Sequence, residues 1–137
     1  MPLSLICFQG IDFTKEKPHQ NFSYERTEEL YVQDCSLADY EFGNFLKVLD
    51  NVTYINFKNV KGLKYFGGEK TIFTKRMEIK HLKTLLISEC EDLHSLDLKC
   101  DILESVSLKK NKNLTGIYLD SINLKNIYVS KCVQLQF

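Results

Sequence analysis

Apolar residues recur with a fixed spacing in the C-terminal half of the chain. The first clear copy of the pattern reads Leu82-xx-Leu85-x-Ile87-xx-Cys90-xx-Leu93. The same spacing returns from Leu103 and again from Leu124, which gives a period of 21. Apolar residues at alternate positions indicate a strand with one buried face, so each copy predicts a short strand that ends in a turn.

Offset copies of the pattern lie between these. They begin at Leu93 and Leu114 and divide each period into a step of 11 followed by a step of 10. We therefore expect two short strands in every turn. A single repeat of this kind cannot bury its own apolar face, and the copies must stack on one another around a continuous core.

The pattern continues more weakly toward the N-terminus. Its copies start at residues 5, 30, 55, 85, 106 and 127, with spacings of 25, 25, 30, 21 and 21, which predicts about six coils. The spacings of 25 leave room for more than a turn. The stretch "SLADYEFGNFLKVLDNV" has apolar residues at roughly helical spacing, and we expect a short helix there.

These features resemble the leucine-rich repeat family, whose pattern is L-x-x-L-x-L-x-x-[NC]-x-L. The resemblance covers residues 27–137, although Val60 and Ile122 stand where Asn or Cys is usual. "LYVQDCSLADYEFGNFLKVLDNVTYINFKNV" resembles a repeat with a helical outer side, and "LESVSLKKNKNLTGIYLDSINLKNIYVSKCVQL" resembles 21-residue bacterial coils. The resemblance implies an α/β solenoid, predominantly β, that forms a right-handed stack of about six coils with a parallel sheet.

We expect one domain over residues 1–137. It comprises irregular coils in 1–63, an insertion in 64–81 that breaks the period, and regular 21-residue coils in 82–137. The net charge is zero, and the five cysteines are an odd number spread along the chain. Free thiols, no basic leader and no apolar run of about 18 residues favour a cytoplasmic protein that does not enter a membrane.

The polar position that closes each strand explains most of the cysteines. Cys35, Cys90, Asn111 and Cys132 share one column of the repeat, where a small side chain can bond to backbone groups at the turn. The alternative is a zinc site formed by Cys90, His94 and Cys100. We disfavour it because the repeat points Cys90 inward, places the other two on outward or turn positions, and contains no C-x-x-C pair. We expect no metal and no cofactor.

Enzymatic motifs are absent from the sequence. The three histidines are scattered, and none belongs to a Ser/His/Asp arrangement, a paired-carboxylate motif or a phosphate loop. The double glycine in "YFGGEK" indicates a turn. We therefore expect a non-enzymatic protein that acts through its surface.

The exposed positions of the strands form the candidate binding surface. Its central column is Tyr31, Asn56, Leu86, Ser107 and Tyr128. Tyrosines among adaptable polar neighbours are typical of an interface centre, although an ordinary solvated sheet face has the same pattern. The predicted partner-binding residues are Glu29, Tyr31, Gln33, Asp34, Tyr54, Asn56, Lys58 and Leu86.

Charge is unevenly distributed along the chain and bears on the partner. Residues 25–50 hold seven acidic against two basic side chains, and residues 58–80 hold seven basic against two acidic. A protein with a basic patch suits the acidic coils. Nucleic acid would have to bind Lys64, Lys70, Lys75, Arg76 and Lys80, and the zero net charge disfavours it.

We therefore predict a protein-binding module that masks or scaffolds another protein. The sharper hypothesis is an immunity protein that neutralises a toxin by covering its active site, and the alternative is a structural adaptor. Two apolar side chains, Leu135 and Phe137, are too few to cover the last coil. We thus expect association through this end, either as a symmetric dimer or with the partner as a cap.

Overall fold

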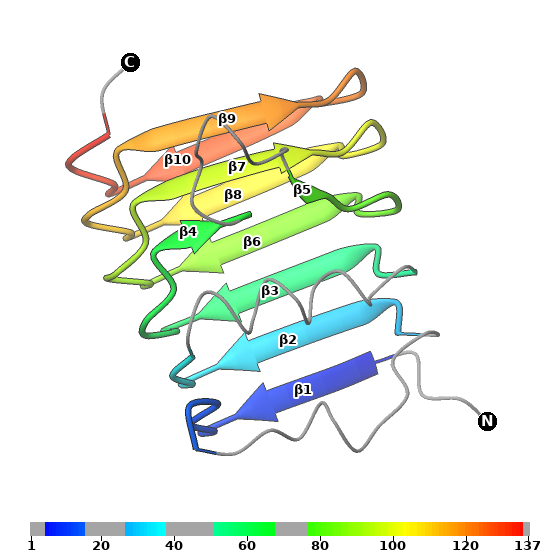
Figure 1. The fold of residues 1–137 in the computed structure, drawn as a ribbon. Coiled ribbons are helices and arrows are strands. Elements are labelled where there is room, and N and C mark those ends of the chain that lie inside the picture. Colours follow the sequence, from blue (N-terminus) through cyan, green and yellow to red (C-terminus); the bar gives the residue numbers. More distant parts are fainter. Residues whose placement is uncertain (1–4, 16–26, 38–50, 68–76, 136–137) are drawn as a thin grey trace.

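The strands of the protein stack into two parallel sheets that lie against each other (Figure 1). The computed structural model describes residues 5–15, 27–37, 51–67 and 77–135. These form a predominantly β solenoid of about four turns, with no helix among the described residues. The coarse prediction of a parallel β solenoid is confirmed. The expected helix falls mainly in residues 38–50, which lie outside the described residues.

The first sheet has six strands, all parallel, in the order β1-β2-β3-β6-β8-β10. Their bounds are β1 Leu5–Gln9, β2 Glu29–Gln33, β3 Tyr54–Lys58, β6 Thr84–Ser88, β8 Ser105–Lys109 and β10 Asn126–Ser130. The second sheet consists of β4 Tyr65–Phe66, β5 Met77–Glu78, β7 Ser95–Lys99 and β9 Gly116–Asp120. The strands β7 and β9 arise from the offset copies of the pattern, so the prediction of two strands per turn is confirmed in the regular coils.

The core lies between the two sheets and follows from the alternation of side chains along each strand. Leu85 and Ile87 of β6 point into it from the first sheet, and Leu96 and Leu98 of β7 from the second; all four are fully or almost fully buried. Each of these positions pairs in register with an apolar residue of the neighbouring coil. The result is a set of apolar columns that runs the length of the stack.

A left-handed residue follows every strand of the first sheet and turns the chain toward the second. The residues at this position, with φ between 52° and 69°, are Gly10, Asp34, Asn59, Glu89, Lys110 and Lys131. Each of the first five donates its backbone N–H to the carbonyl of the last residue of the next strand, at 3.0–3.1 Å for the first four and 2.8 Å for Lys110. The turn is therefore shaped by bonds between coils as well as within them.

The segment 64–81 interrupts one strand of the second sheet. Phe66 pairs with Leu96, and Met77 pairs with Leu98. Met77 comes eleven residues after Phe66, whereas Leu98 comes only two residues after Leu96, so this coil contains nine additional residues. The strands β3, β6 and β8 begin at positions 54, 84 and 105, and these starts differ by 30 and then by 21, which is the same excess of nine. The strands β4 and β5 within this segment thus both belong to the second sheet, and the additional residues fall between Phe66 and Met77.

Two sequence assignments are wrong by a small shift. The first coil was aligned through Leu5, but the structure pairs Ile6 with Leu30, and Leu5 is 46% exposed. A shift of one residue exchanges the two faces of a strand, so Ile6 and Phe8 point inward. Ile122, assigned to a strand-closing position, is 82% exposed. The neighbouring Ser121 takes that position and donates its hydroxyl to Leu103 O at 2.9 Å.

Among the described residues there is no helix with the length and apolar character that crossing a membrane requires.

Candidate protein-binding face

The predicted binding residues lie together on the outer face of the six-stranded sheet. Register pairs Tyr31 of β2 with Asn56 of β3, and Asn56 with Leu86 of β6. The flanking residues pair in the same way, Glu29 with Tyr54 and Gln33 with Lys58. The last of the predicted residues, Asp34, is in the turn after β2. All eight positions are half-buried or exposed, so the structure brings the whole predicted set onto one continuous surface.

The acidic and aromatic side chains of this face contact each other. The rings of Tyr31 and Tyr54 lie 5.3 Å apart between centroids, with a tilt of 42°. Tyr31 donates its hydroxyl to Glu29 Oε1 at 3.5 Å, and Asn56 Nδ2 donates to Tyr54 Oη at 3.4 Å. Desolvation raises the pKa of Tyr31, and the Glu29 carboxylate adds to the rise. Both effects favour the neutral phenol, which is a hydrogen-bond donor beside a fixed negative charge.

The central column extends further than the predicted set. Cys7 of β1 pairs with Tyr31 at one end, and Ser107 and Tyr128 continue the column at the other end. Ser107 and Tyr128 belong to the column that the sequence pattern predicts. The sequence pattern missed Cys7 because it aligns the first coil one residue out of step, which also places Leu5 in the core. The size of Phe8 is the signal that could have found Cys7, because alternation allows either register of this strand and only the register with Phe8 inside places Cys7 on the outer face.

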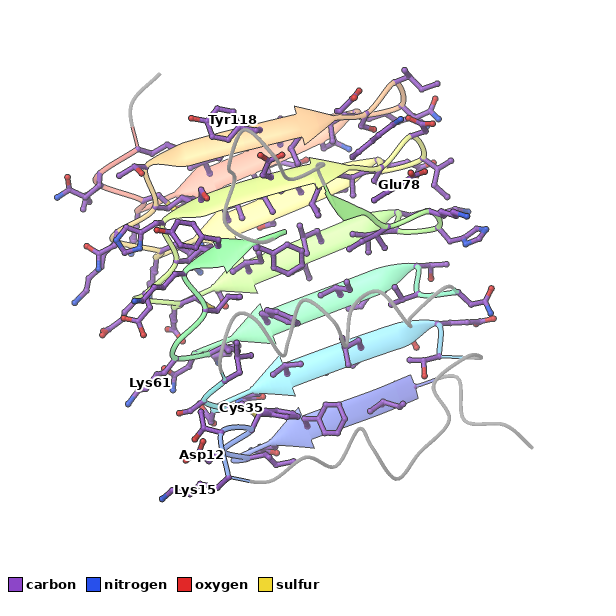
Figure 2. The ribbon with its side chains drawn as sticks, viewed as in Figure 1. Asp12, Lys15, Cys35, Lys61, Glu78 and Tyr118 are labelled. Atoms are coloured by element: carbon purple, nitrogen blue, oxygen red, sulfur yellow. The ribbon has the colours of Figure 1, made fainter. Side chains whose placement is uncertain are left out.

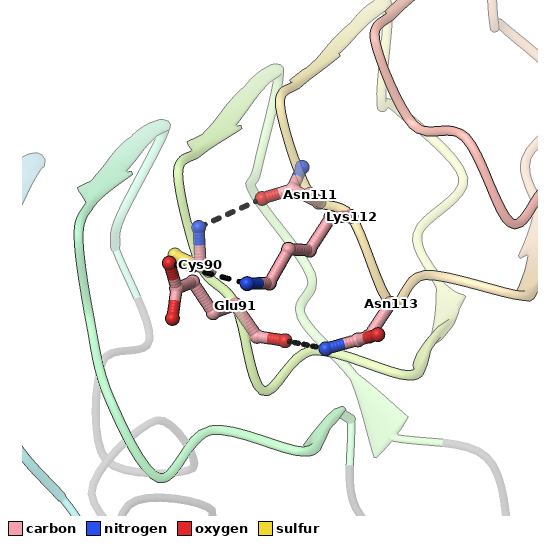
Figure 3. Close-up of polar contacts among 5 residues, drawn as sticks. All are labelled: Cys90, Glu91, Asn111, Lys112 and Asn113. Atoms are coloured by element: carbon pink, nitrogen blue, oxygen red, sulfur yellow. Dashed lines mark hydrogen bonds and ion pairs between the residues drawn. The ribbon is translucent and has the colours of Figure 1, made fainter.

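The column of strand-closing side chains is internal, as predicted. Cys35, Cys90 and Asn111 are buried, and Cys132 in the last coil is partly buried. Asn111 connects two coils. Cys90 N–H donates to Asn111 Oδ1 at 3.0 Å (Figure 3). Asn111 Nδ2 in turn donates to Ile87 O at 3.0 Å. Val60 fills the same column without a polar group and is fully buried.

The cysteines of this core are poor nucleophiles. Burial raises the pKa of Cys90 to about 11, and burial also raises the pKa values of Cys35 and Cys100. All five cysteines are free thiols. Since the thiolate is the reactive form, the buried thiols contribute packing and weak donor groups.

The prediction that Cys100 lies on an outward or turn position is wrong. Its side chain is buried, and its Sγ donates to Leu82 O at 3.0 Å. In the second sheet the strand-closing side chain comes two residues after the last inward residue, whereas in the first sheet it comes three residues after. The described residues contain no group of three His, Cys, Asp or Glu side chains that could hold a metal, so Cys90, His94 and Cys100 do not form one.

The turns that border the outer face differ in charge from one coil to the next. Figure 2 shows Asp12, Cys35 and Lys61 along the same side of the stack in successive N-terminal coils. Asp34 accepts a hydrogen bond from Asn59 Nδ2 at 2.8 Å across neighbouring turns.

Of the basic residues considered for nucleic acid, Lys64 and Lys80 are exposed, and Lys70, Lys75 and Arg76 lie outside the described residues.

Comparison with protein-family models, with curated proteins and with solved structures finds no match to this chain.

Proposed function

We propose that this protein is a non-enzymatic binding module that masks or scaffolds another protein through the outer face of its six-stranded sheet. In this proposal the chain is a leucine-rich-repeat-like, right-handed stack of about six coils, located in the cytoplasm. Its sharper form is an immunity protein that covers the active site of a toxin.

One observation carries the proposal. The rings of Tyr31 on β2 and Tyr54 on β3 contact each other on the outer face, beside the carboxylate of Glu29 and the amide of Asn56. The alternation that buries one side of each strand leaves this set on the other side, in register. Tyrosine rings supply a large contact area at a low cost in conformational entropy, and tyrosine is enriched among residues that dominate binding energy.

The charges around the tyrosines indicate the chemistry of the partner. Glu29 lies next to the ring pair and Asp34 lies at the end of the same strand. A lysine or arginine of the partner placed over the rings would interact with their π faces and with the carboxylates together. A toxin with a basic active site fits this surface.

The experiment uses the wild type and its variants as baits to capture a partner protein from the native host, and it compares how strongly each bait binds that partner. Tyr31→Ala combined with Tyr54→Ala removes the ring pair, and the control Tyr118→Ala removes an exposed tyrosine of β9 on the second sheet (Figure 2). We expect a protein that the wild type and the control capture at equal strength. The double variant should bind that protein about 30-fold more weakly or worse, corresponding to the loss of about 2 kcal/mol.

Circular dichroism and urea unfolding of the three proteins separate a binding defect from a folding defect. For the immunity form, co-expression of the captured protein should be toxic with the double variant and tolerated with the wild type. Equal capture by the wild type and a correctly folded double variant would show that binding does not use this face. Capture without toxicity would leave the masking or scaffolding role and remove the immunity form.

A further inference from the structure

The last coil exposes side chains at positions that are buried in the two coils before it. Ile127 of β10 is 50% exposed, whereas Val106 and Leu85, at the same position of β8 and β6, are fully buried. Val129 of β10 is partly exposed, whereas Leu108 beside it is fully buried. β10 is the outermost strand of its sheet, and no described strand pairs with its outer edge. The apolar columns of the core therefore end in exposed side chains at the outer edge of β10.

The bonds between coils show how a further strand would join this edge. At the entry to β3, β6, β8 and β10, two backbone N–H groups donate to one carbonyl of the preceding coil, as Lys125 and Asn126 donate to Glu104 O at 2.9 and 3.0 Å. At the exit, the left-handed residue donates to the next coil, as Lys110 N–H donates to Ser130 O at 2.8 Å. The equivalent groups of the last coil are the Lys125 carbonyl and the Lys131 N–H. They match a strand that runs parallel to β10.

Charge identifies the residue that should follow such a strand. Asn59 Nδ2 contacts Asp34 Oδ1 at 2.8 Å, so side chains of the left-handed column reach one another between coils. The column ends in two successive lysines, Lys110 and Lys131, which are both exposed. An acidic side chain at the next position of the column would be adjacent to Lys131. Asp34 shows that aspartate takes this backbone conformation, with φ 53°.

We infer that the outer edge of β10 binds an extended segment of a partner protein as an additional parallel strand. The segment carries apolar residues at two alternate positions, over Ile127 and Val129, and an acidic residue two positions after the second. Its backbone continues the sheet, its apolar side chains extend the core columns, and its carboxylate pairs with Lys131. This surface is separate from the outer face and does not depend on the proposed function.

A second copy of the chain fits this edge less well than an acidic segment. If two β10 strands paired antiparallel about a two-fold axis at Tyr128, which aligns Ile127 of one copy with Val129 of the other, Lys125 of one copy would lie beside Lys131 of the other. Like charges at that distance oppose association. The acidic residue of the proposed segment would instead lie beside the positive charge of Lys131, directly after β10.

The test uses two labelled peptides and the complete chain. The peptide Ser-Val-Ser-Leu-Ser-Asp repeats the apolar spacing of β8 and places its acid at the left-handed position; the matched peptide ends in Lys. We expect fluorescence anisotropy to show at least about fivefold tighter binding of the Asp peptide at low salt. Hydrogen exchange of the Lys131 amide should slow when the Asp peptide saturates the protein.

Charge reversal at Lys131 provides the decisive variant. Lys131→Glu is compatible with the fold, because Glu89 has φ 55° at the same turn position. This variant should reverse the preference between the two peptides. The control Lys80→Glu makes the same change of net charge at an exposed residue of another turn and should leave the preference unchanged.

Three results would overturn the inference. One is equal affinity of the two peptides for the wild type, and another is an Asp peptide that binds without slowing exchange at Lys131. The third is a dimer in sedimentation without peptide, with concentration-dependent slowing of exchange at Lys131, because a second copy would then occupy the edge.

Discussion

Asn111 is the polar side chain whose removal should destabilise the fold most clearly. Its amide forms hydrogen bonds with two buried backbone groups of the preceding coil: it accepts from the Cys90 N–H and donates to the Ile87 carbonyl, both at 3.0 Å. Asn111→Ala leaves both groups without this partner in a place that water does not reach. A buried unsatisfied backbone group costs about 1–3 kcal/mol, so the two together should lower the free energy of unfolding by about 3 kcal/mol or more.

Two further variants calibrate this value. Asn111→Cys should lose about half as much, because Cys35 and Cys132 already contact the corresponding carbonyls, Phe8 O at 3.5 Å and Leu108 O at 3.7 Å. Asn113→Ala removes an exposed bond to Glu91 O and should cost under about 1 kcal/mol, since water can replace the amide (Figure 3).

Urea unfolding, followed by circular dichroism, measures all three variants on one scale. The expected order of stability is the wild type, then Asn113→Ala, Asn111→Cys and Asn111→Ala. If Asn111→Ala unfolds within about 1 kcal/mol of the wild type, the amide does not satisfy these groups in the way the structure indicates. A Cys variant less stable than the Ala variant would contradict the equivalence of the column.

Three other predictions concern thiols and turns. A thiol reagent at neutral pH should modify exposed Cys7 well before Cys90, as followed by mass spectrometry; equal rates would show that the column is not buried. Burial raises the pKa of Cys90 from 9.0 to about 11, so its contribution to stability is complete below pH 9 and is lost as the pH rises to about 11. Unfolding free energies measured across this range should fall less steeply for Cys90→Ala than for the wild type, and identical slopes would contradict the shift. Gly62→Ala should cost more than about 3 kcal/mol, because its Cβ would lie 2.1 Å from Leu37 O, whereas Gly10→Ala meets open space and should cost about 1 kcal/mol. Thermal unfolding compares the two glycine variants, and equal losses would mean that the contact between the coils is not close.

The sequence by itself determined the features that depend on local alternation. Leu85 and Ile87 occupy alternate positions and recur one period later as Val106 and Leu108, which predicts strands, stacking and a common core. The same alternation predicted that Tyr31, Asn56 and Leu86 share the opposite face, because side chains of a strand point to its two sides in turn. It predicted the eight residues of the candidate face as a group, although their role in binding stays a proposal.

Only the tertiary structure decided the features that depend on neighbouring coils. Alternation leaves a choice of one residue in register, and in the first coil the pairing of Ile6 with Leu30 resolves it against the sequence alignment. The inward position of Cys100 depends on the carbonyl of Leu82 in the preceding coil, and the division of one strand between Phe66 and Met77 depends on its pairing with β7. The exposure of Ile127, whose sequence context matches that of buried Val106, depends on the absence of a further described strand beside β10. Local periodicity specifies which side of a strand is apolar, whereas register, turn bonds and burial are set by the strand that packs next to it.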